Sequence, residues 1–347
     1  MKIGERKIGT DHSTYIIAEL SANHNGSLDS AMDIIRFAAE SGADAIKLQT
    51  YTADTLTIDC DEEPFILRGG TIWDGRKLYE LYSEAFTPWE WHQDLFDEAK
   101  KHGLDCFSTP FDDSAVKFLE QFDPPCYKIA SFELTHHPLL KTVAETGRPV
   151  IMSTGMASLE EIEEALEVLR GNGSGDIVLL KCTSSYPAPP EEANLARIPD
   201  MAERFGVTVG LSDHTMDLAV PVAAVTLGAT VIEKHFCRSR GEAGPDSSFS
   251  LEPSEFREMV EAVRTAEKAI GKVAYARTAA EEKSVACRTS IFVVEPIEAG
   301  EKLTRKNIRI IRPGQGLAPK YIEDVLGRIA SQDISRGTPL TWDVISV

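Results

Sequence analysis

The chain has 347 residues, of which 42% are hydrophobic, and a formal net charge of −19 at pH 7. This length is enough for a large barrel or sheet together with a small second domain. The acidic balance argues against nucleic acid and anionic lipid as partners. No uninterrupted apolar run reaches the roughly 18 residues that a membrane span needs.

The N-terminal segment MKIGERKIGT lacks the apolar core of a signal peptide. The six cysteines are scattered without C-x-x-C spacing, and three of them lie inside apolar runs (Cys106, Cys126 and Cys182). We therefore expect free, buried thiols and a cytoplasmic protein rather than a disulfide framework or a zinc knuckle.

Short apolar runs alternate with helix-like stretches along most of the chain. The strand-like runs are 15–20, 45–51, 105–111, 126–131, 149–155, 177–187, 208–214 and 230–236. The helix-like stretches are 27–42, 89–103, 113–122, 138–147, 158–173, 196–206, 218–228 and 252–271. Short apolar strands are typical of a buried parallel sheet, and Ser158 and Glu161 have the spacing of a capping box.

Eight strand–helix pairs within residues 1–271 predict an α/β fold of the TIM (β/α)8 barrel type. A doubly wound open sheet is the alternative, but its G-x-G-x-x-G fingerprint does not follow the first strand. Residues 272–286 are charged and alanine-rich and are predicted to be a linker. Residues 287–347 have short β-type runs broken by EAGE, RPGQG and SRGT, which predicts a small β-rich domain.

Polar side chains occur at the end of every predicted strand, where a TIM barrel carries its chemistry. They are Glu19; Lys47 and Gln49; Ser108 and Thr109; Lys128, Ser131 and Glu133; Ser153 and Thr154; Thr183, Ser184 and Tyr186; Ser212 and His214; Glu233, Lys234 and His235. Each one alone is more often a helix cap, a solvated lysine or a hydrogen-bonded histidine. Burying all of them without a ligand would be costly, so together they predict a large polar site.

This site combines two kinds of chemistry. Lys47 and Lys128 would form an anion cradle with hydroxyls, and two ammonium groups suit a phosphate; the hydroxyls are those of Thr109, Ser131, Ser153 and Ser212. His214 and His235 follow adjacent strands, and two imidazoles leave metal positions open for substrate and water. Ligand type alone does not choose between Mn, Fe, Co and Zn. His24 lies in the first loop, and the others are expected at the surface or in loops (His12, His92, His102, His136 and His137).

Motifs along the whole chain resemble the sialic acid synthase family. They are AELSANHNG (18–26), KLQTYTADT (47–55), FSTPFD (107–112), KIASFE (128–133), MSTGM (152–156), GLSDHT (210–215), EKHF (233–236) and GPDS (244–247). The segment IRPGQGLAP (311–319) is similar to part of the antifreeze-like (SAF) domain of that family. The resemblance implies that phosphoenolpyruvate condenses with the aldehyde of an N-acetylated amino sugar to give a 2-keto acid and phosphate.

The resemblance also implies roles for individual residues. His214 and His235 would hold a divalent metal, Mn²⁺ or Mg²⁺ with Co²⁺ as a further option, and Glu19 would act as the acid or base. The phosphoenolpyruvate contacts would be Lys47, Thr109, Lys128, Ser131, Ser153, Ser184 and Ser212. The sugar contacts would be Gln49, Glu133, Tyr186 and Asp246. Arg312 would cap the site of the neighbouring subunit in a domain-swapped homodimer.

Within the family, TPWEWH (87–92), TSSYPA (183–188) and PDSSFS (245–250) look most like the pseudaminic acid synthases. Their sugar is 2,4-diacetamido-2,4,6-trideoxy-β-L-altropyranose. An N-acetylneuraminate or legionaminic acid synthase is the alternative, although Ser184 stands where the N-acetylneuraminate synthases usually carry Asn. The aromatic insertion after the second strand, with Phe65 and Trp73, is expected either to cover the sugar's methyl and acetamido groups or only to pack onto the barrel.

Three other functions remain alternatives. A Schiff-base aldolase would use Lys128 or Lys234 and would keep its activity without metal. A non-catalytic sugar-binding or structural protein would retain the barrel but not need cradle and histidines together. A barrel that condenses phosphoenolpyruvate with a phosphosugar would need a second basic cluster, which the strand ends lack.

Overall fold

The computed structural model describes residues 1–242 and 244–346 and divides into two compact units, which meet in sequence at Gly271 and Lys272. In the first unit, eight parallel strands lie in the order β5-β4-β3-β10-β9-β8-β7-β6, and β5 contacts β6, so that the barrel is nearly closed. The strands are β3 (Tyr15–Glu19), β4 (Ala45–Thr50), β5 (Asp105–Pro110), β6 (Tyr127–Ile129), β7 (Val150–Ser153), β8 (Ile177–Cys182), β9 (Thr208–Asp213) and β10 (Val231–His235). The predicted TIM barrel is confirmed.

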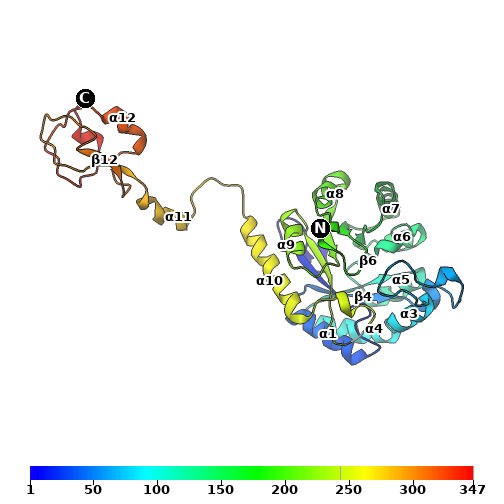
Figure 1. Cartoon of the computed structure of the whole chain (residues 1–347). Coiled ribbons are helices and arrows are strands. Elements are labelled where there is room, and N and C mark those ends of the chain that lie inside the picture. The colour runs from blue at the N-terminus through cyan, green and yellow to red at the C-terminus, as the bar shows by residue number, and fades with distance from the viewer. Residues whose placement is uncertain (243, 347) are drawn as a thin grey trace. The chain divides into compact units, whose positions relative to one another are not determined.

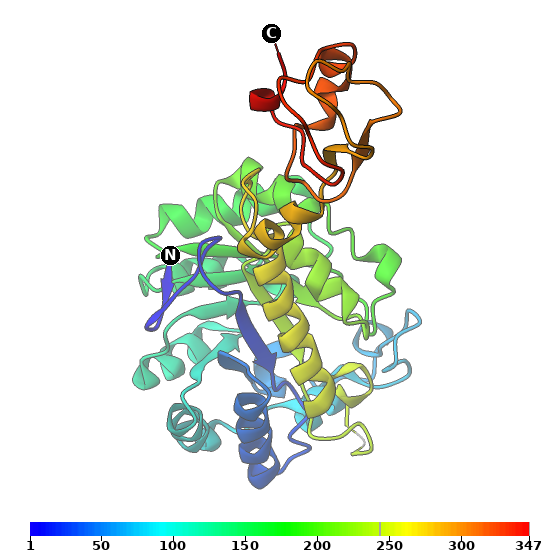
Figure 2. The same ribbon diagram turned by 90° about the vertical axis from the view of Figure 1, so that its left-hand side faces the viewer.

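A ring of helices surrounds these strands (Figure 1). They are α1 (Leu28–Glu40), α4 (His92–Lys101), α5 (Asp113–Leu119), α6 (His137–Ala144), α7 (Leu159–Gly171), α8 (Arg197–Phe205), α9 (Ala219–Thr226) and α10 (Pro253–Ile270). Figure 2 shows α10 running along the outer side of the strands. Ser158 and Glu161 form the expected capping box of α7, since each side chain accepts from the other residue's backbone N–H.

The barrel has an inner and an outer apolar layer, because successive strand residues point to opposite faces. Ile16 and Leu179 belong to the cluster that packs against the helices, whereas Ile17 and Leu180 belong to the cluster inside the barrel. This alternation places Glu19, two residues after Ile17, on the inner side at the carboxyl end of β3. The apolar inner layer thus ends where the polar residues begin.

The segment between β4 and α4 carries α2 (Ala53–Leu56) and α3 (Leu78–Ala85), and the N-terminus forms a small hairpin of β1 (Lys2–Ile3) and β2 (Arg6–Lys7). The second unit contains α11 (Ala279–Ser284), β11 (Ser290–Val293), β12 (Ile308–Ile311) and α12 (Ile322–Val325). β11 and β12 pair antiparallel over a separate core that includes Ile291, Leu303 and Leu340. Within the part of the chain that the structure describes, no helix is both long and apolar enough to cross a membrane.

Replacing Gly210 in β9 by Ala is expected to destabilise the barrel by about 1–3 kcal/mol, as overpacking does. An added Cβ would lie 2.7 Å from Leu180 Cδ2 and would also clash with the Val231 carbonyl of the neighbouring strand. Gly171→Ala, at the end of α7, is the matched control, since no atom lies within 4 Å of its added Cβ. Urea denaturation of both variants should show a loss of stability only for Gly210→Ala; equal midpoints would contradict this packing.

Candidate active site

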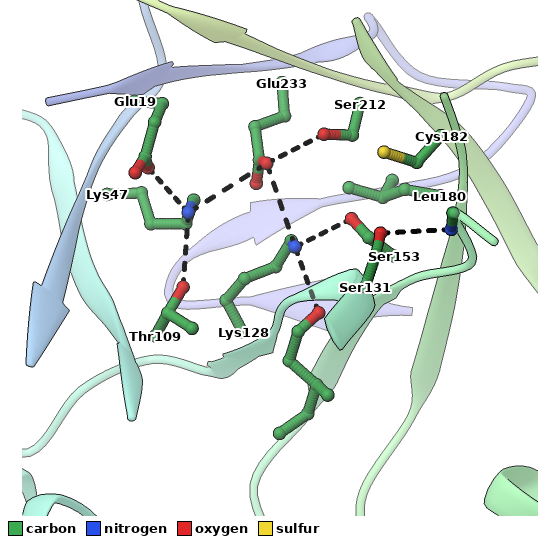
Figure 3. A network of polar contacts seen from close by, with 12 residues as sticks. Glu19, Lys47, Thr109, Lys128, Ser131, Ser153, Leu180, Cys182, Ser212 and Glu233 are labelled. Atoms are coloured by element: carbon green, nitrogen blue, oxygen red, sulfur yellow. Dashed lines mark hydrogen bonds and ion pairs between the residues drawn. The ribbon is translucent and has the colours of Figure 1, made fainter. Parts of the chain in front are cut away.

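Two buried lysines and two buried glutamates meet inside the carboxyl end of the barrel (Figure 3). Lys47 Nζ lies 2.6 Å from Glu19 Oε2 and 4.0 Å from Glu233 Oε1. Lys128 Nζ lies 3.8 Å from the same Glu233 oxygen. The two ammonium groups are thus balanced by two carboxylates, as charges held away from water require.

Hydroxyl groups surround these lysines in the way the sequence predicts. Lys47 Nζ donates to Thr109 Oγ1 at 3.2 Å, and Lys128 Nζ donates to Ser153 Oγ at 2.7 Å. Ser212 Oγ donates to Glu233 Oε1 at 3.0 Å. The structure therefore brings the expected cradle together from five different strands (β4, β5, β6, β7 and β9).

The loop after β7 continues the cradle. Ser131 Oγ accepts from the Gly155 backbone N–H at 3.0 Å. A Cβ on Gly155 would clash with both Ser131 Oγ and Ser184 Oγ, so only glycine allows these two hydroxyls to approach the loop. Ser131 and Ser184 therefore both lie against this glycine, next to the cradle.

The sequence assigned no role to Glu233, although the structure places it between the two lysines. Its Oε2 atom is buried and has no hydrogen-bond partner among the described residues. Two signals were available: its place among the polar strand-end residues, and its position two residues before His235, which puts both side chains on one face of β10. An anion entering the cradle would replace Glu233 as the partner of the lysines.

Burial and neighbouring charges shift the pKa values of the two glutamates and of Lys128 in different directions. Burial raises the pKa of Glu19 to about 7, with Glu233 adding to the rise and Lys47 opposing it. Burial also lowers the pKa of Lys128. The pKa of Glu233 is lowered by Lys128 and Lys47, even though burial acts to raise it. Glu19 is therefore the carboxyl of the pair that can exchange a proton near neutral pH.

The two predicted metal-binding histidines lie side by side, with ring centroids 5.4 Å apart. His214 Nδ1 lies 2.8 Å from the Thr183 carbonyl oxygen; donation of Nδ1–H to this oxygen leaves Nε2 as a free ligand atom. His235 Nδ1 is buried without a hydrogen-bond partner among the described residues. Burial, with His214 as a further cause, lowers the pKa of His235 well below its usual value and keeps it neutral.

These histidines fit a divalent metal by the chemistry of their donor atoms, since a neutral imidazole is a good ligand. In residues 1–242 and 244–346, no group of three or more His, Cys, Asp or Glu could hold a metal. A metal on the histidine pair would therefore keep most of its positions for substrate and water.

The predicted sugar contacts lie around Glu19 and the histidines. Gln49 Nε2 donates to Glu19 Oε1 at 2.8 Å and to Ser21 Oγ at 2.9 Å, and Ser21 in turn donates to Asp246. The Tyr186 ring lies 4.3 Å from the His214 ring. No role for Ser21 in the site was predicted, because its contact with Asp246 exists only in the folded chain.

Two further predicted site residues are Glu133 of the barrel and Arg312 of the second unit. Burial raises the pKa of Glu133 to about 7, and its Oε2 atom is buried without a partner among the described residues. Arg312 belongs to the second unit, where it lines a hollow of about 610 Å³ with Arg288, Cys287 and Pro319. Its role at the barrel stays a prediction.

Trp73 of the insertion joins an aromatic cluster beside the histidines. Its Nε1–H donates to the Pro245 carbonyl at 2.9 Å, and its ring lies 5.7 Å from Tyr186 and 6.1 Å from Phe249. The Phe249 ring is itself 5.0 Å from the His235 ring. Phe65 has no ring contact with this cluster among the described residues, so the geometry supports the expected cover for Trp73 alone.

Other aromatic and histidine side chains serve the packing. Trp89 stacks on Phe118 of α5 with ring centroids 4.5 Å apart, which fits the packing interpretation of the insertion. The expectation that His92 lies at the surface is wrong. His92 is fully buried at the start of α4, and its Nε2 lies 2.8 Å from Thr50 Oγ1. Its ring packs against Phe118 and Phe122, and the sequence did not show these contacts.

Comparison with known proteins agrees with this geometry. Residues 34–275 match the NeuB family, and residues 288–345 match the SAF domain. The chain is 46% identical over 343 residues to a pseudaminic acid synthase of Campylobacter jejuni, with 98% of each chain covered. It is 44% identical to a pseudaminic acid synthase of Helicobacter pylori, covering 95% of this chain and 97% of that protein.

Among solved structures, the chain resembles the spore coat polysaccharide biosynthesis protein SpsE of Bacillus subtilis. The TM-score is 0.68 at 36% identity, with 100% of this chain and 99% of the other covered. The family match covers most of the chain, and the relatives match it over nearly its whole length. The chain therefore belongs to the NeuB family.

Proposed function

We propose that the chain is a synthase that condenses phosphoenolpyruvate with 2,4-diacetamido-2,4,6-trideoxy-β-L-altropyranose to give pseudaminic acid and phosphate. The observation that carries this proposal is the buried cradle of Lys47 and Lys128 with its hydroxyls, beside a carboxyl whose pKa is raised to about 7. The choice of sugar is supported by the Campylobacter and Helicobacter relatives, both named as pseudaminic acid synthases.

In the proposed reaction, the cradle holds the phosphate and carboxylate of phosphoenolpyruvate through Lys47, Lys128 and the surrounding hydroxyls. Carbon 3 attacks the aldehyde carbon, and a carbon–carbon bond forms while protonated Glu19 gives its proton to the aldehyde oxygen. Water then adds to carbon 2 and returns a proton to Glu19. The bond between carbon 2 and the bridging oxygen then breaks, the remaining hydroxyl proton passes to the leaving phosphate, and the ketone forms.

The proposal includes a divalent metal, Mn²⁺ or Mg²⁺ with Co²⁺ as a further option, held by His214 and His235. The metal would supply Lewis-acid polarisation of the sugar aldehyde. The chain's own contribution is the two imidazoles, of which burial keeps that of His235 neutral, and the Tyr186 ring, which lies against His214.

The proposal also includes a cytoplasmic location and a domain-swapped homodimer in which Arg312 of one subunit caps the site of its neighbour. The match of residues 288–345 to the SAF domain supports the presence of the domain that would carry this arginine. Light scattering after gel filtration would give the mass of the assembly. A monomer at micromolar concentration would contradict the homodimer.

The test of the proposed function is phosphate release from phosphoenolpyruvate with Mn²⁺ present. We compare the diacetamido-L-altrose with N-acetylmannosamine and with 2,4-diacetamido-6-deoxymannose. Release with the first sugar alone, abolished by EDTA, is the expected result. Preference for another sugar would contradict the choice of substrate, and activity that survives EDTA together with borohydride labelling would favour a Schiff-base aldolase.

Trp73→Ala is expected to raise the KM for the altrose sugar by about 10-fold, because an aromatic ring that covers an apolar group contributes roughly 1–3 kcal/mol. The KM for phosphoenolpyruvate should stay near the wild-type value, since the ring contacts Tyr186 and Phe249 rather than the cradle. Phe65→Ala is the matched control from the same insertion. Equal sugar KM values for the two variants would contradict a covering role for Trp73.

A further inference from the structure

A buried ion pair lies directly behind the two candidate metal ligands. The register of β9 and β10 sets Lys234 opposite Asp213. Lys234 Nζ is 2.5 Å from Asp213 Oδ2, and the two side chains are 1% and 2% exposed. Asp213 directly precedes His214 in the chain, and Lys234 directly precedes His235.

This pair faces the helices and not the interior of the barrel. Strand residues alternate in direction, so Lys234 shares a face with Ile232 and Asp213 shares one with Leu211. Ile232 and Leu211 both belong to the apolar cluster between strands and helices. Lys234 is therefore placed away from the substrate side, which argues against a Schiff base at this residue.

The pair also holds the residue that follows His214. Asp213 Oδ1 accepts from the Thr215 backbone N–H at 3.0 Å, and Oδ2 accepts from Thr215 Oγ1 at 3.2 Å. Lys234 Nζ donates to the Thr215 carbonyl oxygen. The backbone of His214 is thus fixed on both sides to the strand that carries His235.

We propose that the Lys234–Asp213 ion pair is a positioning pair that sets the separation and orientation of His214 and His235, and through them the affinity for a divalent metal. This inference rests on the metal site of the proposed function. A buried ion pair is seldom needed for stability alone, because replacing both charges by uncharged groups of similar volume is often neutral. The His235 side chain, without a hydrogen-bond partner of its own among the described residues, depends on its backbone for position.

The test is the binding of Mn²⁺ alone to the full-length chain, measured by calorimetry or by the loss of the free-ion EPR signal. The Lys234→Met/Asp213→Asn double variant removes both charges and leaves no unpaired one. We expect it to fold and to bind Mn²⁺ about 10–100-fold more weakly, as is usual when groups that orient metal ligands are lost. Lys234→Arg, which keeps the charge, should recover part of the affinity.

Arg264→Met is the matched control. Arg264 forms ion pairs with Asp44 at 3.2 Å and Glu267 at 2.8 Å near the amino ends of the strands. This variant should lower the melting temperature and leave the Mn²⁺ affinity unchanged. A loss of Mn²⁺ affinity in the control equal to that in the double variant would mean that the pair is merely structural, and it would overturn the inference.

The remaining outcomes separate this inference from the proposed function. A folded double variant with wild-type Mn²⁺ affinity overturns the positioning role alone. If the double variant does not fold, Lys234→Gln/Asp213→Asn replaces it, since it also leaves no unpaired charge and Asn can still accept from Thr215 N–H; unchanged affinity there overturns the role equally. Absence of Mn²⁺ binding by the wild-type chain overturns the metal site and this inference together, whereas the sugar-dependent release of phosphate is measured independently.

Discussion

Glu19→Gln is expected to lower kcat by about 10²–10⁴-fold, the usual contribution of a general acid–base group. The amide keeps one oxygen that can accept from Lys47, and Gln49 can turn its own amide oxygen toward the new NH₂ group, so the local geometry should largely persist. It removes one negative charge beside the two lysines, and the KM for phosphoenolpyruvate should therefore stay equal or fall. A variant that loses kcat while it keeps its substrate affinity identifies a group that acts in the transition state.

The pH dependence of wild-type kcat/KM tests the role of Glu19 in a second way. The proposed reaction needs protonated Glu19 at the start, and burial raises the pKa of Glu19 to about 7. The protonated fraction falls as the pH rises above this value, so wild-type kcat/KM should fall about tenfold per pH unit on the alkaline side. In Glu19→Gln this decline should be absent, because an amide does not titrate.

Glu133→Gln is the matched control, since burial also raises the pKa of the Glu133 carboxyl to about 7. We expect it to raise the KM for the sugar and to keep the alkaline decline. If the decline persists in Glu19→Gln and disappears in Glu133→Gln, the roles of the two carboxyls are exchanged.

His235→Gln is expected to lower kcat/KM by about 10³-fold, which corresponds to roughly 4 kcal/mol of lost electrostatic stabilisation. The half-buried His235 ring lies beside Phe249 and His214, so an amide of smaller size leaves the surroundings largely intact. Mn²⁺ binding should weaken in parallel and should not be restored by raising the pH, because the glutamine amide does not titrate.

His92→Gln provides the control for losing a buried histidine. His92 lies in α4 against Phe118 and Thr50, outside the cradle. This variant should lower the melting temperature and retain Mn²⁺ affinity. Full activity of His235→Gln in the presence of EDTA would contradict the proposed metal site.

The barrel fold could be predicted from the sequence because each barrel strand is a short apolar run with polar residues at one end. Lys47 and Ser153 could be placed in the site by this pattern alone, since parallel strands bring their carboxyl ends to one side. The residues at which each strand begins and ends were harder to predict. The run 126–131 forms a strand only over Tyr127–Ile129, because Ser131 already begins a short 3₁₀ turn.

The sequence could not show which residues far apart in the chain contact each other in the fold. Glu233 neutralises lysines that lie on β4 and β6, and this relation exists only once the barrel has formed. Trp73 is held beside the site by its hydrogen bond to the carbonyl oxygen of Pro245, which lies 172 positions further along the chain. Lys234 looked equivalent to the other strand-end lysines until the register of β10 placed it on the outer face.

The central claim is that the chain joins phosphoenolpyruvate to the sugar aldehyde. Its most direct test is to observe the new carbon–carbon bond. The chain is incubated with Mn²⁺, [3-¹³C]phosphoenolpyruvate and the diacetamido-L-altrose, and carbon and phosphorus NMR spectra are recorded together. The account predicts that the label becomes a CH₂ group bonded to the former aldehyde carbon of a nine-carbon keto acid, while inorganic phosphate appears in equal amount. Phosphate accompanied by labelled pyruvate, with the sugar unchanged, would show hydrolysis without condensation and would contradict the account.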